Sequence, residues 1–112
     1  MNDASQLQCL ANGTTNGTFG ALTQSGTGAI VAASAAGTYT ITLDAGLLGD
    51  NAAPSKARVL ISLLGSAANA NVAGLTKTLV GGQLQIAFTT QIAAGAAANE
   101  AFDYVIWADP SN

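Results

Sequence analysis

Apolar residues alternate with polar ones along two segments of this 112-residue chain, and this alternation restricts the fold more than any other feature. Residues 37–43 read Gly-Thr-Tyr-Thr-Ile-Thr-Leu, and residues 83–89 read Gln-Leu-Gln-Ile-Ala-Phe-Thr. A period of two places the apolar side chains on one face of a β-strand, and β-branched and aromatic residues favour that structure. The residues expected to face the core from these strands are Tyr39, Ile41, Leu43, Leu84, Ile86 and Phe88.

Two further segments predict strands with apolar side chains on both faces. Residues 57–64 are almost entirely apolar, and residues 101–107 are rich in aromatic residues. Such strands lie in the middle of a sandwich or at a contact between subunits. In the second segment, one predicted face carries Phe102, Tyr104 and Ile106, and the other carries Asp103, Val105 and Trp107.

Weaker patterns predict strands at residues 6–10, 18–22, 28–33 and 75–80, whereas residues 93–98 are interpreted as a loop. Turn-forming residues recur between the strands, as in sandwiches and barrels. The predicted fold class is all-β, a single compact antiparallel β-sandwich (jelly roll) of about eight short strands. The predicted turns are Asn12-Gly13, Asn16-Gly17, Ser25-Gly26, Gly46, Gly49-Asp50-Asn51, Pro54, Gly65 and Gly81-Gly82, and this interpretation is preferred to glycosylation at Asn12 and Asn16.

The chain carries very little charge. Only 8% of its residues are charged, against roughly a quarter in ordinary soluble domains. A monomer usually needs a charged surface to stay soluble, so this composition favours a chain whose surface is largely covered by other subunits. With three cations and a net charge of −3, the sequence offers no basic surface to nucleic acid. Its long uncharged stretches are interrupted by glycine and polar residues, so we expect no membrane partner and synthesis in the cytoplasm.

The residue types needed for common catalytic and metal sites are missing. The chain has no histidine and one cysteine, Cys9, which excludes histidine-based catalysis and zinc sites built from cysteine and histidine. A disulfide within the chain is excluded as well, and Cys9 is expected to be a small, half-buried residue. We therefore expect no cofactor, no metal and no enzymatic activity.

The carboxylates do not change this expectation. Asp44 and Asp50 lie near glycines, but this loop supplies too few oxygen ligands for calcium, so a turn is the better interpretation. Asp103 could pair with Glu100 or Asp109 in a hydrolytic site, but no other sequence feature marks a pocket there.

Four segments together resemble a known group of proteins. They are Ser25-Gly26-Thr27-Gly28, Gly37-Thr38-Tyr39-Thr40-Ile41-Thr42-Leu43, Val59-Leu60-Ile61-Ser62-Leu63 and Ala101-Phe102-Asp103-Tyr104-Val105-Ile106. Residues 25–107 resemble small jelly-roll domains of tailed-phage virions, which occur as head decoration proteins and as the knobs of head or tail fibres. The wider fold group is similar to the globular head of complement and to the tumour necrosis factor trimer.

The resemblance implies a homotrimer of jelly rolls without a catalytic site, with the major capsid protein of the virion as its partner. The expected function is that of a capsid decoration (cement) protein on the outer head surface, made in the host cytoplasm. The alternative is a fibre knob that recognises a receptor or glycan. The chain begins at Met1 without a stalk before the domain, which favours decoration.

One domain is expected, with residues 25–112 as the sandwich and residues 1–24 as either an N-terminal arm ordered on a partner or ordinary edge strands. Candidate residues for a subunit or capsid interface are aromatic, because aromatic side chains bury the most area. A place in the core is an equally strong interpretation for two of them, Phe88 and Phe102. The candidates are Trp107, Tyr104, Phe102, Phe88 and Tyr39.

Overall fold

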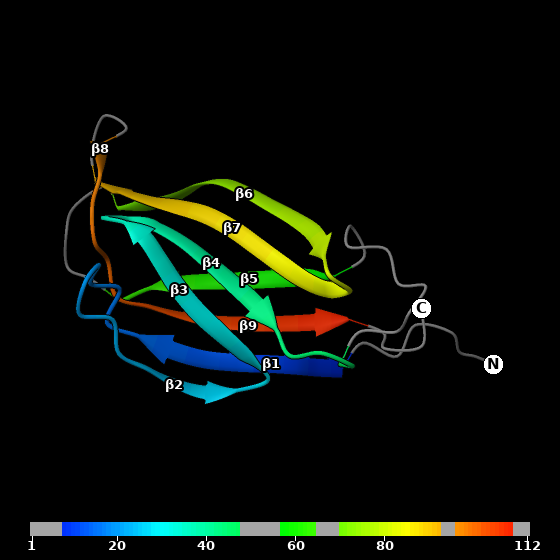
Figure 1. Cartoon of the computed structure of the whole chain (residues 1–112). Helices are drawn as coiled ribbons and strands as arrows, with labels where there is room; N and C mark the ends of the chain where they lie inside the picture. Colours follow the sequence, from blue (N-terminus) through cyan, green and yellow to red (C-terminus); the bar gives the residue numbers. More distant parts are fainter. Residues whose placement is uncertain (1–7, 48–56, 65–69, 93–95, 109–112) are drawn as a thin grey trace.

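The computed structural model describes residues 8–47, 57–64, 70–92 and 96–108, and within these ranges the chain is an antiparallel β-sandwich (Figure 1). The first sheet has the strand order β2-β1-β9-β5, and the second has the order β3-β4-β7-β6, with β8 paired to β7. The predicted fold class is confirmed. The strands are β1 Gln8–Thr15, β2 Gln24–Thr27, β3 Ala29–Ala35, β4 Thr38–Leu43, β5 Arg58–Leu63, β6 Asn71–Val80, β7 Gln83–Ile92, β8 Ala96–Ala97 and β9 Phe102–Ala108.

The core lies where β4 and β7 of the second sheet face β9 of the first. β4 and β7 pair in register, with Tyr39 opposite Phe88 and Ile41 opposite Ile86. All six residues predicted to face the core from these two strands are buried. Period-two alternation therefore predicted both the strands and the faces that they bury.

Of the two places predicted for residues 57–64, β5 does not occupy the one in the middle of the sandwich. It is half-buried on one face and exposed on the other, and it lies at the end of its sheet, where it pairs only with β9 among the described strands. Val59, Ile61 and Leu63 pack against the core, whereas Leu60 is 53% exposed. β9 lies inside the sheet as predicted, with one face buried and the other half-buried.

The N-terminal half also departs from expectation. Residues 18–22 form no strand, and β2 was not predicted. Asn12-Gly13 and Ser25-Gly26 are not turns, because Gly13 pairs with Gly26 inside the β1–β2 ladder. A Cβ atom on Gly13 would lie 2.6 Å from the Tyr104 hydroxyl oxygen, so this glycine makes room for a core ring.

The remaining predictions can be placed along the chain. The strands predicted at residues 28–33 and 75–80 correspond to β3 and β6. The strand predicted at residues 6–10 corresponds to β1, which continues as far as Thr15. β1 lies between β2 and β9 and is therefore not an edge strand. Ala96–Ala97 form β8 where a loop was predicted. Turns are confirmed at Gly46 and Gly81-Gly82, whereas Asn16-Gly17 lies in the loop after β1, in which the turn falls at Phe19-Gly20. The predicted turns at 49–51, Pro54 and Gly65 lie outside the described residues.

Side chains join the two sheets on both sides of the sandwich. On one side the Gln24 amide of β2 donates to the Val31 carbonyl oxygen at 2.8 Å and accepts from the Val31 N–H at 2.9 Å. The Gln24 side chain thereby occupies the outer edge of β3. On the other side the Lys77 Nζ of β6 donates to the Ala57 carbonyl oxygen at 2.8 Å, just before β5. These bonds satisfy backbone groups that the ladders leave unpaired.

Replacing Gln24 tests its part in holding β3. We expect Gln24→Ala to lower the free energy of unfolding by about 1–2 kcal/mol, because both polar groups of the buried Val31 backbone lose their partner. Urea unfolding measures the change. Gln85→Ala on the outer face of β7 is the control, and an equal loss in both variants would contradict the assignment.

Candidate functional site

Four of the five predicted interface residues fill the core. The rings of Tyr39, Phe88 and Phe102 form a cluster with centroids 5.0–5.5 Å apart, and Tyr104 is also buried. Side chains so deeply covered by their own chain offer no surface to a partner. The core interpretation therefore holds for Phe88 and Phe102, and it extends to the two tyrosines.

The Tyr39 hydroxyl connects two loops at one end of the sandwich. It donates a hydrogen bond to the Gly17 carbonyl oxygen and accepts one from the Glu100 N–H at 3.1 Å. The two loops are in close contact, because a Cβ atom on Gly17 would lie 1.9 Å from the Glu100 carbonyl oxygen. One buried hydroxyl thus satisfies the hydrogen bonds of a backbone N–H and a backbone carbonyl from segments far apart in the sequence.

The carboxylates considered as a catalytic pair lie in different environments. Glu100 is buried just before β9, and its Oε1 has no hydrogen-bond partner in the described part of the chain. Asp103 is half-buried on the outer face of β9. Asp109 lies outside the described residues.

The outer face of the first sheet carries the fifth candidate, Trp107. Because Phe102, Tyr104 and Ile106 face the core, the alternate residues of β9 face outward, and the ladders place residues of β5 and β1 beside them. We call this surface the outer patch. Its three rows are Arg58, Trp107 and Cys9, then Leu60, Val105 and Asn12, and finally Ser62, Asp103 and Thr14.

The outer patch has an apolar centre with polar residues around it. Leu60 is 53% exposed, and it pairs across the ladder with the half-buried Val105. Arg58 and Asp103 place opposite charges in the two outer rows. An apolar centre with a polar rim is the usual composition of a protein interface. Sequence reasoning missed Leu60, although its place between two core-facing residues of an alternating strand was a usable signal.

Cys9 lies at one corner of the outer patch and is exposed, which corrects the expectation of a half-buried residue. The pairing of β1 with β9 shifts between Cys9 and Ala11, and Ala11 faces the core instead. The thiol donates to the Ala11 carbonyl oxygen at 3.5 Å.

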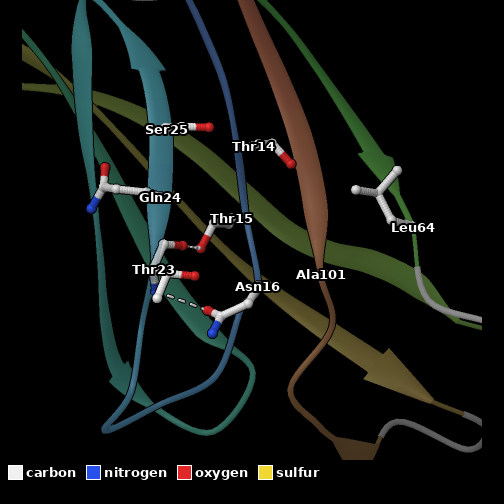
Figure 2. Close-up of a pocket in the computed structure, with 8 residues that line it drawn as sticks. All are labelled: Thr14, Thr15, Asn16, Thr23, Gln24, Ser25, Leu64 and Ala101. Atoms are coloured by element: carbon white, nitrogen blue, oxygen red, sulfur yellow. Dashed lines mark hydrogen bonds between the residues drawn. The ribbon is translucent and has the colours of Figure 1, made fainter.

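Two shallow depressions, of about 460 and 360 Å³, adjoin the outer patch along β1 and β2 and share Thr14 and Ser25. Figure 2 shows the first of them. There, the Thr15 hydroxyl donates to the Thr23 carbonyl oxygen at 2.7 Å, and the Thr23 N–H donates to Asn16 Oδ1 at 3.0 Å. Several polar groups of this depression are thus engaged in hydrogen bonds that stabilise the loop between β1 and β2. The residues that line the first depression are Thr14, Thr15, Asn16, Thr23, Gln24, Ser25, Leu64 and Ala101.

One titratable group beside this region is perturbed. Burial raises the pKa of the Tyr104 hydroxyl above its ordinary value, and the negative charge of Asp44 raises it further. Both effects favour the neutral phenol in the folded chain.

Comparison of the chain with protein-family models, with curated proteins and with solved structures gives no match. Within the described ranges, no three His, Cys, Asp or Glu side chains form a group that could hold a metal ion. No helix in those ranges has the length and apolar character that a membrane span requires. The outer patch and the two depressions are therefore the surface features that bear on function.

Removing the Tyr39 hydroxyl tests the link between the two loops. We expect Tyr39→Phe to lower the free energy of unfolding by about 2 kcal/mol, because a buried N–H and a buried carbonyl lose their partner. Tyr104→Phe is the matched control, since the Tyr104 hydroxyl forms no hydrogen bond within the described residues. Equal losses in urea unfolding at pH 7 would contradict the prediction.

The raised pKa of Tyr104 predicts a loss of stability in alkali. The unfolded chain releases this proton near its ordinary pKa of 10.0, before the folded chain does, so stability is complete below that pH and falls as the pH rises through it. We expect Tyr104→Phe to show a shallower decline than the unmodified chain between pH 9 and pH 11. Urea unfolding across that range measures both slopes, and parallel slopes would contradict the prediction.

Proposed function

We propose that this chain is a structural protein of a phage virion, a capsid decoration protein that binds the outer head surface as a homotrimer. The observation that carries the proposal is the outer patch, where Leu60 is 53% exposed beside Val105 and Trp107 in a chain with few charges. Contiguous apolar surface of this kind marks interaction sites.

Two of the four segments that carry the resemblance to virion jelly rolls lie in the core, which supports the proposal. Tyr39, Ile41 and Leu43 of β4 and Phe102 and Tyr104 of β9 form much of the core. Among the five aromatic candidates, Trp107 alone remains half-buried on an outer face. We therefore assign Trp107, and not the buried rings, to the contact with other subunits.

Low charge suits a protein that works by covering a surface. Burying charges in a contact requires their desolvation, and a weakly charged face largely avoids this cost. A trimer that bridges neighbouring capsid subunits binds only the assembled head. It therefore stabilises that state by mass action.

The alternative is a knob that binds a receptor or a glycan. The depressions favour it, since Thr14, Ser25 and Asn12 present neutral hydroxyl and amide groups on one face. Such groups suit the hydroxyls of a neutral sugar.

Native mass and co-sedimentation test the proposal. Light scattering of dilute protein is expected to give about 33 kDa, three times the 11.0 kDa chain. The protein is then expected to co-sediment with expanded empty heads at saturating stoichiometry. A stable monomer, or binding to host cells without binding to heads, would refute decoration, and the second result would favour the knob.

Truncating Trp107 tests the assignment of the contact. We expect Trp107→Ala to weaken trimer formation and head binding by at least about tenfold, because interface energy concentrates in buried aromatic residues. Ile30→Ala is the control, since Ile30 is 62% exposed on the opposite sheet. Thermal unfolding of both variants separates a lost contact from a lost fold. Equal binding by both variants would place the contact elsewhere.

A further inference from the structure

The edges of the two sheets are protected unequally. Along β3, the Gln24 side chain bonds both backbone groups of Val31. β6 is interrupted by a register shift between Ala73 and Thr76, and it carries Lys77. β2 is only four residues long and contains Gly26. Short strands, bulges and lysines are the usual means by which sheets prevent pairing with other chains.

β5 has none of these features. Its ladder with β9 runs without a register shift from Arg58 to Leu63, and its sequence, Arg-Val-Leu-Ile-Ser-Leu, contains no glycine, proline or lysine. Branched aliphatic residues favour an extended strand. Among the described strands, β5 is therefore the one long edge without protection.

The backbone groups of β5 that no other described strand pairs with can be identified. The Leu64 N–H donates to the Ala101 carbonyl oxygen at 2.8 Å. Because antiparallel strands alternate between hydrogen-bonded and non-hydrogen-bonded pairs, Ser62, Leu60 and Arg58 also direct their backbone groups toward β9. Val59, Ile61 and Leu63 then direct their N–H and C=O groups away from the sheet.

We propose that β5 pairs with β5 of a second copy of this chain, antiparallel and about a two-fold axis at Ile61. This inference is independent of the proposed virion function. In this register Val59 faces Leu63 of the second copy, so every open backbone group on Val59, Ile61 and Leu63 gains a partner. The contact is self-complementary, as a two-fold interface requires.

Side chains and a neighbouring bond support the same register. Leu60 faces Ser62 of the second copy and Arg58 faces Leu64, so no like charges are opposed. A register centred on Leu60 would instead require pairing at Ala57, whose carbonyl oxygen accepts a bond from Lys77 Nζ at 2.8 Å.

Pairing of single strands buries less than a standard interface, so the contact is expected to be weak, with a dissociation constant on the order of 10–100 µM. The mass should therefore rise with concentration, from one chain to about 22 kDa or, because a trimer carries three β5 edges, from about 33 kDa to about 66 kDa and larger species.

Two double variants test the register by sedimentation equilibrium. Both positions are exposed, so each variant retains the core. Both also lie in the outer patch, so doubling is measured relative to the mass of each variant in dilute solution. Leu60→Lys with Ser62→Lys opposes like charges across the axis, and we expect it to weaken doubling at least tenfold. Leu60→Lys with Ser62→Glu opposes unlike charges, and we expect doubling at least as strong as in the unmodified chain. Ile30→Lys, on the other sheet, should leave doubling unchanged.

The outcomes separate the two proposals. Absence of doubling up to about 1 mM, doubling that survives the two lysines, or failure of the lysine–glutamate variant to restore it would each overturn the β5 contact. A trimer that does not double would overturn this inference and leave the proposed function standing. A monomer that doubles only to a dimer would support the β5 contact and refute the homotrimer of the proposed function.

Discussion

The packing of Tyr39 against Phe88 and Phe102 is the interaction on which the rest of the structure depends. These rings come from both sheets and fill the space between them. The Tyr39 hydroxyl then bonds Gly17 and Glu100, so the same side chain anchors the loops at one end. With no disulfide within the chain, this combination of apolar packing and a satisfied buried hydroxyl holds the two sheets together.

The surfaces left uncovered by this core define what the chain can contact. The outer patch presents Trp107 and Leu60 on one sheet face, and the β5 edge presents open backbone groups beside it. A threefold contact at the patch and a two-fold contact at the edge would together join copies into a network over a surface. The two contacts rest on different physics, because one buries apolar side chains and the other satisfies backbone hydrogen bonds.

Sequence reasoning succeeded where a single local pattern decides the structure. Alternation placed β4 and β7 and their buried faces, because a half-buried strand shows its period directly. It failed at β5, where an apolar run does not distinguish an edge from a central strand. It also failed at Asn12-Gly13, where the glycine accommodates the Tyr104 ring from another strand and forms no turn. The candidate site was predicted only at Trp107, since the places of the other rings depend on long-range pairing.

By itself, the sequence determined that this chain forms a β-sandwich with a small aliphatic and aromatic core, few charges and no histidine chemistry. Those properties follow from residue types and their local spacing. Only the tertiary structure decided which strand lies at an edge, which aromatic residue remains near the surface and which backbone groups Tyr39 and Gln24 satisfy. These outcomes depend on pairing between segments up to 100 residues apart along the chain, as Gln8 lies beside Ala108 and Cys9 beside Trp107, and local patterns carry no information about such partners.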